Sequence, residues 1–180
     1  MVINLLVSLA LAVAPATGGL SGRVTYAGSA SAAEPIDMSA YGHAGKPVRI
    51  RTELIQTLLG SGFLPVISPV ARNATAVHGA ALNVNGDDAA AAIAAAMNAE
   101  LWMIADVAGV LSAEKKVLAS LDIAQTEELV TSGVVNKGMH AKLEAGFSAL
   151  EHGASAVRIA GLEAVMNPEG KHGTLLTASM

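Results

Sequence analysis

Cysteine is absent from this 180-residue sequence, and aromatic and charged residues are scarce. Without cysteine the chain has neither disulfides nor thiolate metal sites, and the absence fits the cytoplasmic location that we expect. Aromatic residues make up 3% and charged residues 14% of the chain, so small aliphatic residues must pack the core. A hydrophobic fraction of 52% requires many elements to be buried on both sides, as in alternating strands and helices.

Positive charge is also sparse, with 11 lysines and arginines against 15 acidic residues. Because no basic cluster occurs, we expect no nucleic-acid partner. The chain lacks the phosphate loop G-x-x-x-x-G-K-[ST] and the nucleophile elbow G-x-S-x-G, so neither a P-loop enzyme nor an α/β-hydrolase is predicted. The histidines show no short metal-ligand spacing, and we predict solvent or core roles for them and no protein-bound metal: His43, His78, His140, His152 and His172.

The apolar run at residues 1–14 has two interpretations. It is shorter than the roughly 20 residues of a membrane span, so no membrane partner is expected. The Ala-Ser-Ala at 30–32 resembles a secretory cleavage site, but no lysine or arginine precedes Arg23, and the positive start of a signal peptide is missing. We favour a buried helix over residues 3–14. Since that helix is apolar on nearly every face, we expect a homodimer or higher homo-oligomer to cover it.

Apolar periodicity and turn residues predict an alternation of strands and helices. Strands are expected at 46–50, 63–68, 101–105, 154–160 and 173–177, and helices at 52–59, 87–97, 125–132 and 138–151. Thr52 is expected to cap the first of these helices. This order predicts an α/β protein, a three-layer αβα sandwich with a mostly parallel open sheet. Ligands in such sheets bind at the carboxyl ends of the strands.

The stretch Asn-Val-Asn-Gly-Asp-Asp at 83–88 precedes an alanine-rich run and is the most informative part of the chain. If it is extended, the side chains of Asn83, Asn85 and Asp87 converge beside a helix N-terminus, where anions are favoured. This arrangement suggests a site for a carboxylate or a phosphate. The alternative is a turn in which Asp87 or Asp88 caps the helix.

Two further polar residues lie at element ends. Asp106 follows the apolar strand 101–105 and either caps a turn, accepts a hydrogen bond from a ribose or holds a lysine. Lys142 lies near the start of helix 138–151, where a cation meets the positive end of the dipole at a cost of about 0.3–1 kcal/mol. A surface lysine tolerates that cost. A phosphate between Lys142 and the helix N-terminus would instead make the position favourable.

The order of motifs resembles the acetylglutamate kinase family, which has the amino acid kinase fold. The motifs are Asn-Val-Asn-x-Asp at 83–87, Ala-Asp-Val-x-Gly-Val at 105–110, Ser-Gly-Val-Val-x-x-Gly-Met-x-x-Lys-Leu at 132–143 and Gly-Thr at 173–174. The resemblance extends upstream through 62–67, 41–45 and 19–22, and it covers nearly the whole chain.

This resemblance implies a function and a site. Asn83 and Asn85 would bind the substrate amino acid, Asp87 would orient catalytic lysines, and Lys142 would neutralise charge on the phosphoryl group. The nucleotide site would include Asp106, Val107, Gly109, Val110, Gly138 and Met139. The implied reaction is in-line attack of the side-chain carboxylate of N-acetyl-L-glutamate on the γ-phosphate of ATP, with Mg²⁺ held through the phosphates, in arginine biosynthesis.

The chain departs from the family at two places. No residues match the family's K-x-G-G loop, its second glycine-rich loop or its substrate-clamping arginine, and Lys137 replaces a glycine. We therefore expect a truncated chain, with 1–70 as the remainder of the substrate-binding and dimerisation lobe and 71–180 as a nucleotide-binding lobe on one continuous sheet. A carrier-linked aminoadipate kinase of lysine biosynthesis and a non-catalytic nucleotide-binding or assembly module stay open as alternatives.

Overall fold

The computed structural model describes residues 44–73, 81–167 and 172–178. The predicted helix 3–14 lies outside the described residues, as do His43 and His78. The elements in chain order are β1 (Ala44–Gly45), α1 (Thr52–Gly60), β2 (Val70–Arg72), β3 (Ala81–Val84), α2 (Gly86–Met97), β4 (Glu100–Ala105), β5 (Ser120–Leu121), α3 (Ile123–Thr131), α4 (Lys137–Glu151), β6 (Ala156–Gly161), α5 (Leu162–Met166) and β7 (Thr174–Leu176).

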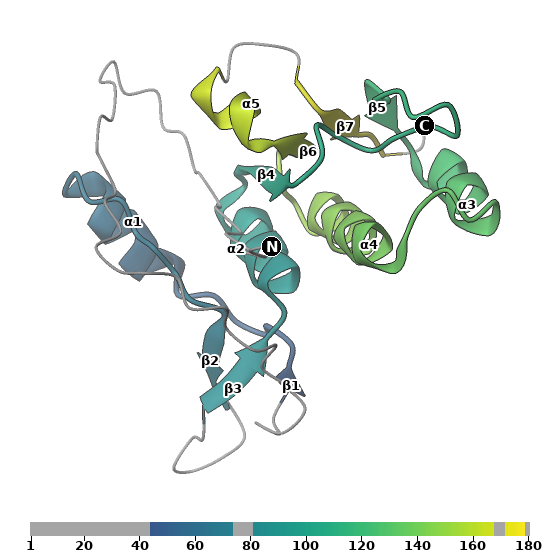
Figure 1. Ribbon diagram of the computed structural model, residues 1–180. Helices are drawn as coiled ribbons and strands as arrows, with labels where there is room; N and C mark the ends of the chain where they lie inside the picture. The colour runs from purple at the N-terminus through teal and green to yellow at the C-terminus, as the bar shows by residue number, and fades with distance from the viewer. Residues whose placement is uncertain (1–43, 74–80, 168–171, 179–180) are drawn as a thin grey trace, which may run out of the picture.

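The larger sheet has the strand order β4-β6-β7-β5. The β4–β6 and β5–β7 pairs are parallel, and β6–β7 is antiparallel. Helices α2 and α4 pack on one face of this sheet, and α5 lies on the other (Figure 1). The structure therefore confirms the predicted α/β class with its three layers.

Small and branched aliphatic side chains fill the layer between the sheet and α2 and α4. Alternate residues of β4 and β6 point into it, because successive side chains of a strand face opposite sides. The buried residues there include Leu101, Met103, Val157, Ile159, Ala90, Ala94, Leu143 and Ala149. On the opposite face of the sheet, the Arg158 guanidinium lies over the Trp102 ring, 5.6 Å from its centroid. Alanine on α2 lets the two helices pack side by side.

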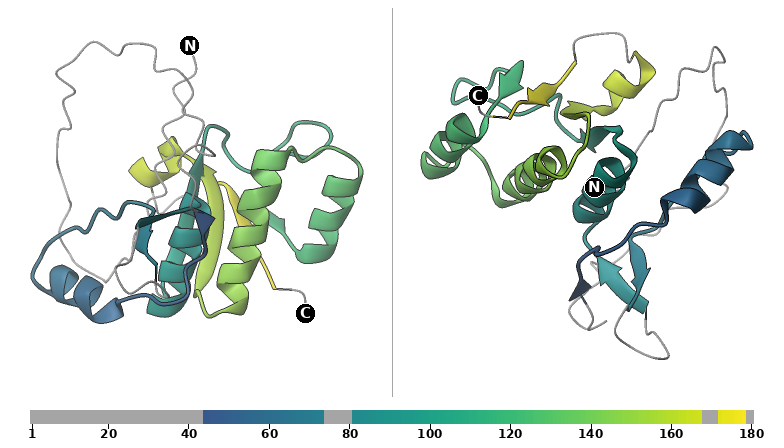
Figure 2. Two further views of the ribbon diagram at one scale, coloured as in Figure 1. Left: turned by 90° about the horizontal axis from the view of Figure 1, so that it is seen from below. Right: turned by 180° about the vertical axis from the view of Figure 1, so that it is seen from behind.

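A second, smaller sheet has the order β1-β3-β2, with β1–β3 parallel and β2–β3 antiparallel. Figures 1 and 2 show it apart from the larger sheet, at the end where α2 begins. The expectation of one continuous sheet over 71–180 is therefore wrong for the described residues, because β3 pairs with β1 and β2 instead. The division into two lobes at residue 70 stays a prediction.

The predicted strands at 46–50 and 63–68 do not form. Pro47 and Pro65 interrupt these runs, and proline has no N–H to donate to a neighbouring strand. The second run is also largely exposed: Phe63 is 64% exposed and Val66 is 87% exposed. Thr52 is the first helical residue of α1 rather than its cap; the cap position is Arg51, which makes no capping bond through its side chain.

The remaining predicted elements are confirmed to within about two residues. They are β4, β6 and β7 among the strands and α1, α2, α3 and α4 among the helices. The helix α3 begins at a capping box, in which Asp122 accepts from the Gln125 N–H and Gln125 accepts from the Asp122 N–H. Among the described residues, no helix has the length and apolar character that a membrane crossing needs.

Candidate functional site

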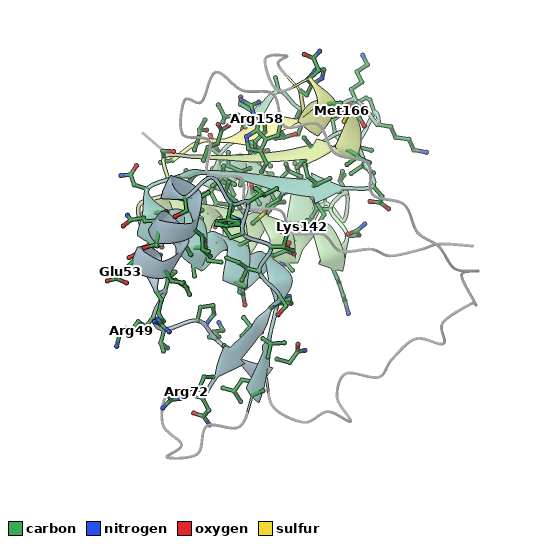
Figure 3. All side chains as sticks on the ribbon, turned by 90° about the vertical axis from the view of Figure 1, so that its left-hand side faces the viewer. Arg49, Glu53, Arg72, Lys142, Arg158 and Met166 are labelled. Atoms are coloured by element: carbon green, nitrogen blue, oxygen red, sulfur yellow. The ribbon has the colours of Figure 1, made fainter. Side chains whose placement is uncertain are left out.

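An ion pair joins the first turn of α2 to the N-terminal half of α4. The Lys142 ammonium lies 2.7 Å from Oδ1 of Asp87, and their side chains are 14% and 9% exposed. Asp87 lies in the first turn of α2, where the helix dipole favours a negative charge. Figure 3 shows Lys142 on the helix side of the larger sheet, opposite Arg158. An ammonium has three donors, so Lys142 can bind Asp87 and an anion together.

The cap of α2 is Asn85, so the alternative in which Asp87 or Asp88 caps this helix is wrong. Oδ1 of Asn85 accepts from the N–H groups of Asp87, at 2.8 Å, and Asp88, at 3.3 Å. The helix begins at Gly86, so Asp87 is not part of the extended segment. The Asp87 side chain therefore contacts Lys142 from the first turn of a helix, and not from one face of an extended strand as the sequence suggested.

Asn83 lies in the smaller sheet and does not belong to α2. It is half-buried in β3, where its register partners are Ala44 and Val70. Asn85 is exposed, and its oxygen is already engaged by the backbone. The amide nitrogen of Asn85 is thus its remaining group for a ligand, and it is a donor suited to a carboxylate.

The start of α4 repeats the capping arrangement of α2. Oδ1 of Asn136 accepts from the Met139 N–H at 2.8 Å, and Lys137 and Gly138 are exposed in the first turn. A Cβ atom added to Gly138 would meet only the Asn136 oxygen, at 3.5 Å. This helix start is therefore open enough for a ligand to approach its backbone.

The loop after β4 carries the other predicted nucleotide residues. Asp106 is exposed and Val107 is half-buried, whereas Gly109 and Val110 are buried. The Val110 N–H donates to Oγ1 of Thr174 at 2.8 Å. The burial of Gly109 and Val110 makes them structural parts of the loop, and the exposed face is at Asp106.

Thr174 was not assigned a role by the sequence. The Gly-Thr pair at 173–174 is visible in the sequence, but nothing local shows that its hydroxyl reaches a residue 64 positions away.

Within the described ranges, no group of three histidine, aspartate or glutamate side chains is placed to hold a metal ion. His140 lies 3.8 Å from Glu144 on α4.

The sequence profile of the amino acid kinase family matches residues 5–161. The chain therefore belongs to this family. It is 41% identical over 119 residues to the acetylglutamate kinase of Cereibacter sphaeroides, covering 66% of this chain and 40% of that protein. It is 35% identical over 146 residues to the acetylglutamate kinase of Geobacillus stearothermophilus, covering 80% and 55%.

The structure also resembles a solved one, smu.665 from Streptococcus mutans UA159, with a TM-score of 0.64 and 28% identity. The match covers 81% of this chain and 56% of that chain. The chain thus spans about half the length of the relatives that it matches.

Proposed function

We propose that this chain carries the nucleotide site and part of the substrate site of a kinase that phosphorylates N-acetyl-L-glutamate in arginine biosynthesis. The observation that carries the proposal is the Asp87–Lys142 pair at the adjoining starts of α2 and α4. It supplies a cation, oriented by a carboxylate, beside two helix N-termini. The names of the similar kinases support N-acetyl-L-glutamate over a carrier-linked aminoadipate.

In the proposed reaction, an oxygen of the substrate carboxylate attacks the γ-phosphorus of ATP. The new P–O bond forms as the bond to the β,γ-bridging oxygen breaks, and ADP leaves with that electron pair. Mg²⁺, bound through the nucleotide phosphates, would offset their negative charge. Lys142 would stabilise the charge on the transferring group, and Asp87 would hold the ammonium in place.

The other residues have supporting roles in the proposal. Asn83 and Asn85 would bind the substrate, with Asn85 donating from its amide nitrogen because its oxygen caps α2. In the loop after β4, the exposed Asp106 and the half-buried Val107 would contact the nucleotide, together with Gly138 and Met139, and the buried Gly109 and Val110 would hold the loop in shape. A cytoplasmic location and self-association as a homodimer or higher oligomer are further predictions.

Trapping of the acyl phosphate with hydroxylamine tests the proposal. With Mg²⁺, ATP and N-acetyl-L-glutamate, we expect hydroxamate from the wild-type chain and a large loss in Lys142→Ala. Lys137→Ala is the matched control, because Lys137 is an exposed lysine in the same helix. No hydroxamate from the wild type, or equal amounts from all three proteins, would contradict the assignment.

A further inference from the structure

We propose that Thr174 is a positioning residue for the nucleotide, because its hydroxyl fixes the loop between β4 and β5. This inference rests on the proposed function, in which Asp106 and Val107 of that loop contact the nucleotide. Thr174 is fully buried at the start of β7. Its Oγ1 accepts from the Val110 N–H at 2.8 Å and donates to the Leu118 carbonyl at 2.7 Å. Both hydrogen-bonding functions of the hydroxyl are therefore used on one loop.

The two partners of Thr174 form the base of a small hairpin. The Leu118 N–H donates to the Val110 carbonyl at 2.9 Å, and Leu111 and Val117 form an antiparallel bridge beyond them. In a regular antiparallel pair, Val110 would also donate directly to the Leu118 carbonyl. The Thr174 hydroxyl replaces that second bond by standing between the donor and the acceptor. A side chain of β7 thus sets the width of the hairpin base.

Two glycines permit this close approach. A Cβ atom on Gly109 would lie 2.8 Å from Cγ1 of Val117 and 2.9 Å from Oγ1 of Thr174. Gly173 has a φ of +74°, and a Cβ atom there would collide with the Ile159 carbonyl. The loop and β7 are therefore packed without room for a side chain on either backbone.

The Thr174 hydroxyl also fixes the residues just before the hairpin. Asp106 follows β4 directly, so the segment 106–110 is held at one end by the sheet and at the other by Thr174. In Thr174→Val, the shape is kept but the Val110 N–H and the Leu118 carbonyl lose their partner. Because buried polar groups require partners, the hairpin base must close or admit water, and the nucleotide residues shift with it.

Titration calorimetry with Mg-ADP on the full chain tests this inference. We expect Thr174→Val to bind about tenfold or more weakly, because the loss of about 1.4 kcal/mol corresponds to a factor of ten. Thr174→Ser retains the hydroxyl and should bind within about threefold of the wild type. Thr126→Val is the matched control, because Thr126 is also buried and its hydroxyl donates locally, to the carbonyl of the α3 cap residue Asp122 at 2.6 Å.

Hydrogen exchange of the wild-type chain without nucleotide provides a test that needs no variant. The Val110 amide should be protected, and the protection should fall in Thr174→Val but not in Thr126→Val. Rapid exchange at Val110 in the wild type would overturn the inference. A folded Thr174→Val chain that binds Mg-ADP as well as the wild type would also overturn it. Absence of binding by the wild type would instead overturn the proposed nucleotide site itself.

Discussion

Breaking the Asp87–Lys142 pair should cost measurable stability even without ligand. In Lys142→Met, the long apolar stem is retained, but the 9%-exposed Asp87 carboxylate loses an ammonium at 2.7 Å. Removing one partner of a buried pair costs about 3–5 kcal/mol. The N-terminus of α2 offsets part of that cost, by about 0.3–1 kcal/mol, because its dipole favours the carboxylate. The two capped helices stay packed through their apolar faces, so we expect a folded chain destabilised by about 2–5 kcal/mol.

Urea denaturation of four proteins measures this directly: the wild type, Lys142→Met, Asp87→Asn and the double variant. We expect the double variant to lose less free energy of unfolding than the two single variants lose together. The difference is the coupling free energy, about 1–3 kcal/mol. Lys137→Met controls for the removal of a lysine from the same helix, and its effect on the free energy of unfolding should lie within about 0.5 kcal/mol. Additive effects of the two substitutions would refute the ion pair as an energetic link between α2 and α4.

Three other predictions concern the cap of α2, the loop after β4 and the exposed apolar side chains. Asn85→Ala removes the cap of α2 and should cost about 0.5–2 kcal/mol in urea denaturation, and an unchanged midpoint would contradict the capping role. Gly109→Ala should overpack the loop, cost about 1–3 kcal/mol and lower the melting temperature. Gly138→Ala, on an exposed turn, should not lower it. Equal melting temperatures of the two variants would count against the tight packing at Gly109. The exposed apolar side chains of Phe63 and Val66, with the predicted helix 3–14, should make the chain dimerise at micromolar concentration; a clean monomer in light scattering would argue against it.

The sequence predicts most of the elements between residues 81 and 161, because their apolar periodicity is strong and their caps are local. It places the cap of α2 wrongly because three residues able to cap occur within four positions, at Asn85, Asp87 and Asp88. It also predicts strands at 46–50 and 63–68 from apolar content, where the proline-interrupted backbone forms none. These errors concern hydrogen bonding, which the apolar pattern does not encode.

The site is predicted only as far as its residues belong to motifs. The resemblance implies that Asp87 orients catalytic lysines, and the structure places it against Lys142, 55 positions along the chain. Asn83 lies in the smaller sheet, whereas Asp106 follows the last residue of β4 in the larger sheet, and no local pattern indicates this separation. The hydrogen bond between Thr174 and Val110 cannot be predicted from the sequence either, because a single bond between distant segments produces no periodic pattern of residues.

Calorimetric titration of the wild-type chain and Lys142→Ala with Mg-ATP, in the absence of a phosphoryl acceptor, tests the central claim, that an adenine nucleotide binds near the starts of α2 and α4. We expect saturable binding by the wild type and a loss of about 1.5–3 kcal/mol in the binding free energy of Lys142→Ala, the value of a charge-assisted hydrogen bond. Binding that is absent at millimolar nucleotide, or that is unchanged in Lys142→Ala, would contradict the claim.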